Sequence, residues 1–110
     1  KRARQTALAE AAAEAIDVPL RLMALCREGM RCALDIASSS NKNVASDLGI
    51  GAILFAAAAR SAALTAEMNF GGIPDAAVRA AYEERAAGLA ADIDELEGRV
   101  LAVVRERMRR

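Results

Sequence analysis

Polar and apolar residues along the first third of the chain recur with the period of an α-helix. Polar side chains follow one another at steps of three, four or seven residues, which places them on one face. They are Glu10, Glu14, Asp17, Arg21, Glu28, Arg31 and Asp35. The opposite stripe is apolar or small: Leu8, Ala12, Ala15, Leu22, Leu25 or Cys26, Gly29, Ala33 and Ile36. Because the polar stripe keeps its phase across Pro19, the pattern predicts one kinked helix over residues 2–37.

A second helix is predicted after a small, polar loop at residues 38–43. Its N-terminus is expected at Ser46 and Asp47, where a hydroxyl can cap and a carboxylate meets the positive end of the helix dipole. Residues 48–59 carry no charge, so this helix, closed by Asn69, is expected to be central and buried. Its twelve-residue apolar run is shorter than the ~20 residues of a bilayer span, so we expect no membrane anchor.

A third helix is predicted over residues 74–108. Gly71 or Gly72 could take a left-handed helix stop, and Pro74 suits a first turn. The apolar stripe of this helix is Val78, Tyr82, Leu89, Ile93, Leu96, Val100 and Val103 or Val104. Three long antiparallel helices do not close a four-helix core. The sequence therefore predicts an all-α fold, with residues 1–110 as a single domain whose helical bundle is completed by a partner chain or a missing N-terminal half.

Composition sharpens this prediction. Alanine fills 28 of 110 positions against three aromatic residues, which favours closely packed helices and excludes an all-β domain. Fifteen basic residues balance fifteen acidic ones, with basic clusters only at residues 1–4 and 105–110, so we expect no nucleic-acid partner. The chain has no histidine, which excludes histidine-based triads and histidine metal ligands. Cys26 and Cys32 face different ways on one helix and are interpreted as two buried free thiols in a reducing cytoplasm.

The densest polar segment is residues 40–47, which brings two amides, an ammonium, a hydroxyl and a carboxylate to a helix start. Such a set suits a polar heteroaromatic ligand, but composition alone favours an ordinary capped helix start. Arg60 is a single charge inside an apolar helix and needs an acidic partner, either Glu67 or an acid elsewhere. Asn69 is a candidate C-terminal cap. No metal-ligand spacing, phosphate-binding glycine loop or activated nucleophile is present.

Several short motifs occur in a specific order: Asp17-Val18-Pro19-Leu20, Asn41-x-Asn43-x-x-Ser46-Asp47, Ala58-Ala59-Arg60-Ser61-Ala62-Ala63-Leu64, and Asn69. In this order they resemble the formiminotetrahydrofolate cyclodeaminase / methenyltetrahydrofolate cyclohydrolase family over essentially the whole chain. The sequence departs from the family pattern at Ser40, where the family has glycine, and at Thr65, where it has asparagine. Family members are about twice as long, and this chain resembles their C-terminal half. The N-terminal half, with its Gly-rich turn and acidic helix, is expected to be absent or in another segment.

The resemblance implies a cytoplasmic helical homodimer acting on tetrahydrofolate one-carbon adducts. It would hydrolyse the 5,10-methenyl bridge or eliminate ammonia from the 5-formimino group, with no metal and no cofactor besides the folate substrate. On the matching positions Asp47 would be catalytic, and Asn41, Asn43, Ser46, Arg60 and Asn69 would bind substrate, with Ser46 also capping the helix. The alternative hypothesis is a catalytically inactive helical assembly module of the same fold, which Ser40, Thr65 and the missing half would favour.

Overall fold

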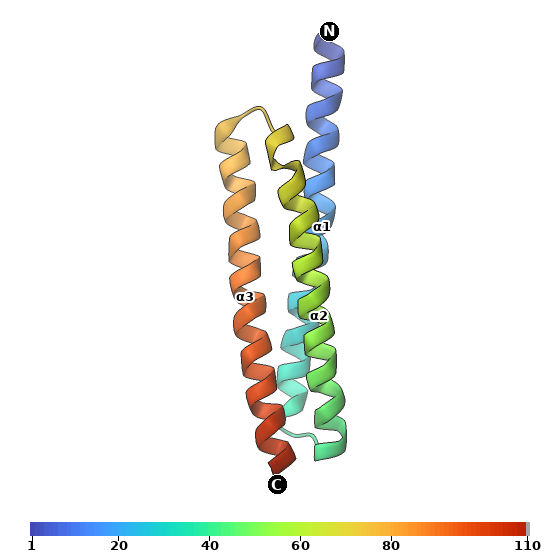
Figure 1. The fold of residues 1–110 in the computed structure, drawn as a ribbon, viewed down its shortest axis with the longest axis vertical. Coiled ribbons are helices and arrows are strands. Elements are labelled where there is room, and N and C mark those ends of the chain that lie inside the picture. The colour runs from blue at the N-terminus through green and yellow to red at the C-terminus, as the bar shows by residue number, and fades with distance from the viewer. Residues whose placement is uncertain (110) are drawn as a thin grey trace.

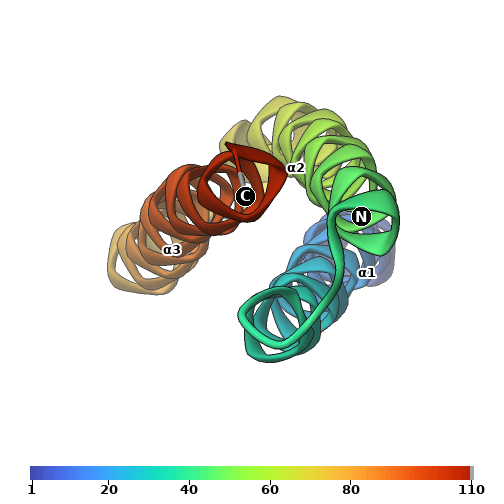
Figure 2. The same ribbon diagram turned by 90° about the horizontal axis from the view of Figure 1, so that it is seen from below.

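The computed structural model describes residues 1–109, and these form three long helices without a strand. Helix α1 spans Arg2–Ala37, α2 spans Lys42–Asn69, and α3 spans Ala76–Arg109, with a short 3₁₀ turn, η1, at Phe70–Gly72. The helices run down, up and down in a rod of 65 × 18 × 17 Å (Figure 1). Seen along the rod, α2 lies at the corner between α1 and α3 (Figure 2). The predicted all-α fold is confirmed.

Helix α1 continues through Pro19 without interruption, as its polar pattern predicts, but its buried face includes only Cys26 and Ala33 of the predicted apolar stripe. Ile16, Leu20, Met23 and Met30 are at most 1% exposed. The predicted stripe residues Leu8, Leu22, Leu25 and Ile36 are exposed instead. Apolar residues occupy two sides of α1, and within this chain α2 and α3 cover one of them.

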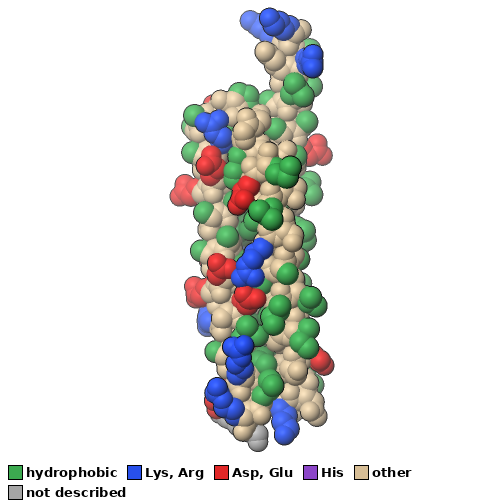
Figure 3. All heavy atoms as spheres, in the orientation of Figure 1, with side chains coloured by type: hydrophobic (Ala, Val, Ile, Leu, Met, Phe, Trp, Pro, Cys, Tyr) green, Lys and Arg blue, Asp and Glu red, His purple; other side chains and the backbone are tan. Residues whose placement is uncertain are grey.

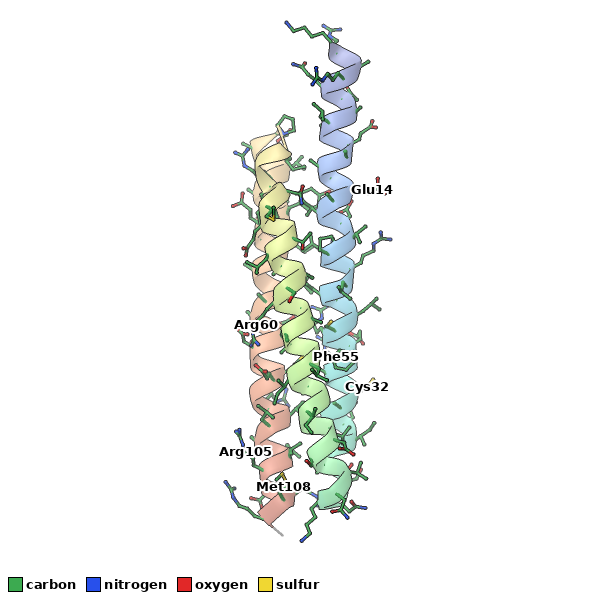
Figure 4. The ribbon with its side chains drawn as sticks, turned by 45° about the vertical axis from the view of Figure 1, so that its right-hand side comes forward. Glu14, Cys32, Phe55, Arg60, Arg105 and Met108 are labelled. Atoms are coloured by element: carbon green, nitrogen blue, oxygen red, sulfur yellow. The ribbon has the colours of Figure 1, made fainter. Side chains whose placement is uncertain are left out.

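The two cysteines of α1 differ in exposure, which corrects the prediction that both are buried. Cys26 is 3% exposed, and burial raises the pKa of its thiol. Cys32 is exposed (Figure 4). Both are free thiols, as expected.

Helix α2 begins five residues earlier than the sequence predicts. Its N-cap is Asn41, and Lys42 is the first helical residue. Either asparagine or serine can supply a capping oxygen. In the structure residues 42–45 have helical backbone, so the cap is Asn41 and not Ser46. Ser46 and Asp47 therefore lie one turn inside the helix.

Helix α2 is buried along one side only, so the expectation of a wholly buried central helix is wrong for the single chain. The buried row consists of small residues: Ala45, Gly49, Ala52, Ala56, Ala59, Ala62 and Ala66. On the other side Ile50, Leu54, Leu64 and Met68 are 53–86% exposed. Two neighbouring helices cover about half of a helix circumference, and the apolar remainder faces outward.

Helix α2 with its following turn, Lys42–Gly72, is long and apolar enough to cross a membrane by length and composition alone. The core helix of a soluble protein meets the same two conditions. The sequence-based expectation of no membrane anchor therefore stays a prediction.

The connection between α2 and α3 is a 3₁₀ turn, not the predicted left-handed glycine stop. No residue among 1–109 has positive φ, so neither Gly71 nor Gly72 adopts that conformation. Pro74 precedes the helix instead of starting it. Asp75 caps α3, its Oδ1 accepting from the backbone N–H groups of Ala77 at 2.8 Å and Val78 at 3.2 Å.

The core is built from the large residues of α1 and α3 against the small row of α2. On α3 the predicted stripe is confirmed at Leu89, Ile93, Leu96, Val100 and Val104, while Val78 is exposed. Close packing of α1 on α2 depends on Gly29, because a Cβ there would lie 2.5 Å from Cζ of Phe55. Small residues thus set the spacing between the helices.

Candidate functional site

The predicted site lies at the N-terminus of α2, where one asparagine holds the helix start. Oδ1 of Asn41 accepts from the backbone N–H groups of Asn43 at 3.0 Å and Val44 at 3.1 Å. These bonds use the oxygen of the Asn41 amide, and its NH₂ group can still donate. Asn43 is exposed in the first turn. The structure therefore brings the two amides together at one end of the bundle.

Ser46 and Asp47 follow one turn later on the same helix. Ser46 is half-buried and does not cap α2, which corrects its predicted structural role. The Asp47 side chain is exposed, and residues 1–109 supply it with no hydrogen bond or ion pair. At 100° per residue Asn43 and Asp47 point to neighbouring directions, away from the row that packs on α1 and α3.

The loop before the site is fixed from both of its neighbours. The hydroxyl of Ser40, which is 8% exposed, donates to the carbonyl of Ile36 at 2.8 Å. The carbonyl of Ser40 accepts from Nε of Arg107 on α3, also at 2.8 Å. Sequence reasoning missed Arg107 because 67 residues separate it from Ser40 and its local pattern shows only a basic cluster.

A hollow of about 370 Å³ lies beside this loop and the end of α3. Its lining residues are Ser38, Ala102, Val103, Glu106 and Arg107. Neither Asn43 nor Asp47 lines it, so in the single chain these two side chains face solvent outside an enclosed pocket.

Arg60 lies on the side of α2 that faces α3 and is held there by two carboxylates (Figure 4). Its Nη2 donates to Oε1 of Glu97 at 2.7 Å and to Oδ1 of Asp94 at 2.8 Å. These hydrogen bonds raise the pKa of the guanidinium, and the bond to Glu97 has a larger effect than the bond to Asp94. The predicted acidic partner is therefore on α3 and is not Glu67. Arg60 is separated from Asp47 by ~20 Å along the helix, so the two do not share a site.

Asn69 closes the other end of α2. Its Nδ2 donates to the carbonyl of Thr65 at 2.8 Å, so this carbonyl near the end of α2 has a hydrogen-bond partner. Asn69 and Asn43 are ~40 Å apart along the helix axis. One chain thus gathers Asn41, Asn43, Ser46 and Asp47 and leaves Arg60 and Asn69 elsewhere.

Metal ligands do not gather in the described part of the chain, where no group of three or more cysteine or carboxylate side chains is close enough to share an ion. The polar groups of the helix start are amides, a hydroxyl and one carboxylate. Such groups can donate to and accept from a heteroaromatic ligand and move a proton.

The chain is thus an all-α protein, an antiparallel bundle whose polar candidate site, with amides and a carboxylate, lies at the start of its most apolar helix. A family model described as formiminotransferase-cyclodeaminase matches residues 1–88, and the chain belongs to this family. A methenyltetrahydrofolate cyclohydrolase of Methylorubrum extorquens is 34% identical over 108 residues, which are 98% of this chain and 52% of that protein. The chain therefore spans about half the length of the curated relative that it matches.

Proposed function

We propose that this chain is a folate one-carbon enzyme, or the C-terminal half of one, acting on 5,10-methenyl- or 5-formimino-tetrahydrofolate. The observation that carries the proposal is the ordered set Asn41, Asn43, Ser46 and Asp47 at one helix start in a member of this family. The name of the 34% identical relative supports the hydrolytic reaction over ammonia elimination.

In the hydrolytic reaction Asp47 takes a proton from the water that attacks the methenyl carbon. As the tetrahedral carbon breaks its bond to N5, Asp47 returns that proton to N5 and the remaining hydroxyl proton is released to solvent, which leaves the 10-formyl product. The amides of Asn41 and Asn43 would orient the pterin or the bridge by donating and accepting hydrogen bonds. In the eliminating reaction N10 attacks the formimino carbon and loses its proton, and the former imino nitrogen gains two protons and leaves that carbon as ammonia, which leaves the 5,10-methenyl cation.

The proposal includes three further properties. Catalysis requires no metal and no resident cofactor, since proton transfer and hydrogen bonding suffice for either reaction. The active form is a homodimer, which is supported by the exposed apolar side of α2. The protein works in the cytoplasm, where its two free thiols stay reduced.

The experiment follows the loss of the methenyl-tetrahydrofolate chromophore with the wild-type chain, with Asp47→Asn and with buffer alone. We expect the wild type to accelerate the loss, and Asp47→Asn to lower the rate by ~100-fold, the smaller end of a general-base contribution. Asp35→Asn, an exposed acid on α1, is the matched control and should leave the rate unchanged.

The second candidate function is a catalytically inactive helical assembly module of the same fold. It is favoured by the exposure of Asn43 and Asp47 outside any enclosed pocket of the single chain. Equal chromophore loss in wild type, Asp47→Asn and buffer would reject this chain as an enzyme by itself and favour the module.

A further inference from the structure

The outward side of α2 carries a regular row of side chains, here called the outer row: Ile50, Leu54, Ala57, Ser61, Leu64 and Met68. All six residues are exposed, and none is charged. Their spacing alternates between four and three residues, which is the pattern of a helix seam that packs against another helix. In Figure 3 hydrophobic side chains lie along this helix, whereas charged side chains gather mainly on its neighbours and at the ends of the rod.

The apolar area on this side is large enough for a stable interface. A groove of about 460 Å³ between α1 and α2 continues the surface toward Val18 and Leu22. The large apolar residues involved are Val18, Leu22, Ile50, Ile53, Leu54, Leu64 and Met68, each 45–86% exposed. Together they expose on the order of 800 Å², which equals one partner's share of a standard protein interface and exceeds the usual apolar patch of a monomer.

The outer row is symmetric about position 59. Two large residues stand at each end, and the small residues Ala57 and Ser61 stand in the middle. A two-fold axis beside position 59 would place Ile50 opposite Met68, Leu54 opposite Leu64 and Ala57 opposite Ser61 of another copy, and the reverse. The small middle allows the two helices to approach closely, while the large ends pack on each other.

Charge distinguishes the antiparallel from the parallel arrangement. Asp47 continues the outer row toward the N-terminus of α2. A parallel pair would place the two Asp47 carboxylates against each other, which is unfavourable. In the antiparallel pair Asp47 instead meets the turn after α2 in the other copy, near position 71, where η1 carries no charge.

We propose that the outer row is the interface between two antiparallel copies of this chain, and that the α2–α3 turn of each copy completes the candidate site of the other. This arrangement brings Asn69 of one copy close to Asp47 of the other, although one chain holds Asn69 and Asn43 ~40 Å apart. The role given to the completed site rests on the proposed function, whereas the interface does not.

Cross-linking tests the register directly. Ala57→Cys and Ser61→Cys are made separately in a Cys32→Ser background, which leaves only buried Cys26. After oxidation we expect the mixture of the two variants to form a covalent pair at least tenfold faster than either variant alone. Opposed positions meet the short Cβ distance of a disulfide, and like positions are offset by ~6 Å. Equal rates for single variants and mixture, or no pair in any sample, would overturn the register.

Sedimentation equilibrium tests the interface itself. Wild type and the control Val78→Glu, an exposed residue of α3, should sediment as two copies. Leu54→Glu should weaken association by ~100-fold or more, because each interface would bury two unpaired carboxylates. A wild type that sediments as one copy overturns the proposal. Its flotation with phosphatidylcholine vesicles would then assign the surface to a membrane. If the protein stays in solution instead, the result would assign the surface to packing against another helical segment, such as the half of the relative that this chain does not span.

Association needs no folate, so the two proposals fail separately. A covalent pair without turnover would reject this chain as an enzyme by itself and leave the interface standing. Turnover by a single copy would reject the interface and leave the function standing.

Discussion

Asn41 illustrates how one residue can hold the backbone and still be available to a ligand. Its side-chain oxygen accepts two backbone hydrogen bonds and so starts α2, while its amide NH₂ group remains a donor. Asn43, two residues later, makes no comparable contact with the helix start and is exposed. The stability and the activity of the protein therefore depend on these two asparagines to different degrees.

This difference predicts that truncation to alanine lowers the free energy of unfolding at Asn41 and not at Asn43. Asn41→Ala should lower the free energy of unfolding by ~1 kcal/mol because the cap is lost. Asn41→Asp should keep most of the wild-type free energy of unfolding, since a carboxylate also caps a helix. Asn43→Ala is the matched control and should stay within ~0.5 kcal/mol of wild type. Urea unfolding measures all three, and equal losses for both alanine variants would contradict the assignment of Asn41 as the cap.

Packing between α1 and α3 determines the environment of Tyr82, the only tyrosine of the chain. Burial, followed by the negative charge of Asp17 on α1, raises the pKa of its hydroxyl. The unfolded chain therefore releases this proton at lower pH than the folded chain does. Its contribution to stability is complete below pH ~10 and is lost as the pH rises through the higher folded value.

Because the sequence has no tryptophan, absorbance of the tyrosinate reports this residue alone. We expect the native midpoint to lie above the midpoint in urea, which should be near ~10. Asp17→Asn should lower the native midpoint without abolishing the difference, since burial is the larger cause. Asp35→Asn, at the far end of α1, should leave it unchanged. Identical native and urea midpoints would mean that α3 does not pack on α1 as described.

At the level of elements, sequence patterns located all three helices because their periodicity depends only on neighbouring residues. The start of α2 was predicted five residues late, since Asn41 and Ser46 are both competent caps and only the fold selects between them. A local sequence pattern could not predict the partners of Arg60, because Asp94 and Glu97 lie more than 30 residues away along the chain. The candidate site was predicted from its motif and stays a prediction, and its exposure in the single chain was not predicted.

The molecule as a whole has two apolar sides on α2, one packed within the chain and one facing outward. Ala52 is fully buried in the packed row, whereas Ala58 is exposed beside the groove between α1 and α2. The two alanines are six residues apart on one helix, so the same substitution at each distinguishes the packed side from the outward side.

Ala52→Glu should lower the free energy of unfolding by more than ~4 kcal/mol, because it buries an unpaired carboxylate. Ala58→Glu should keep the helical fold, since its carboxylate reaches solvent. Circular dichroism melting is measured at a dilution where the wild type is one copy, so that association does not contribute. Cooperative melting of both variants at similar temperatures would show that the Ala52 side is not the core.

The alanine-rich packing of α2 has a consequence for how stability depends on temperature. A methyl group buries far less apolar surface than a leucine or phenylalanine side chain, and the heat capacity of unfolding follows the apolar surface exposed. The row from Ala45 to Ala66 gives this bundle a core with little such surface per residue. Its heat capacity change should therefore lie below the ~12–15 cal/mol/K per residue of ordinary domains, and its stability curve should be correspondingly broad and flat.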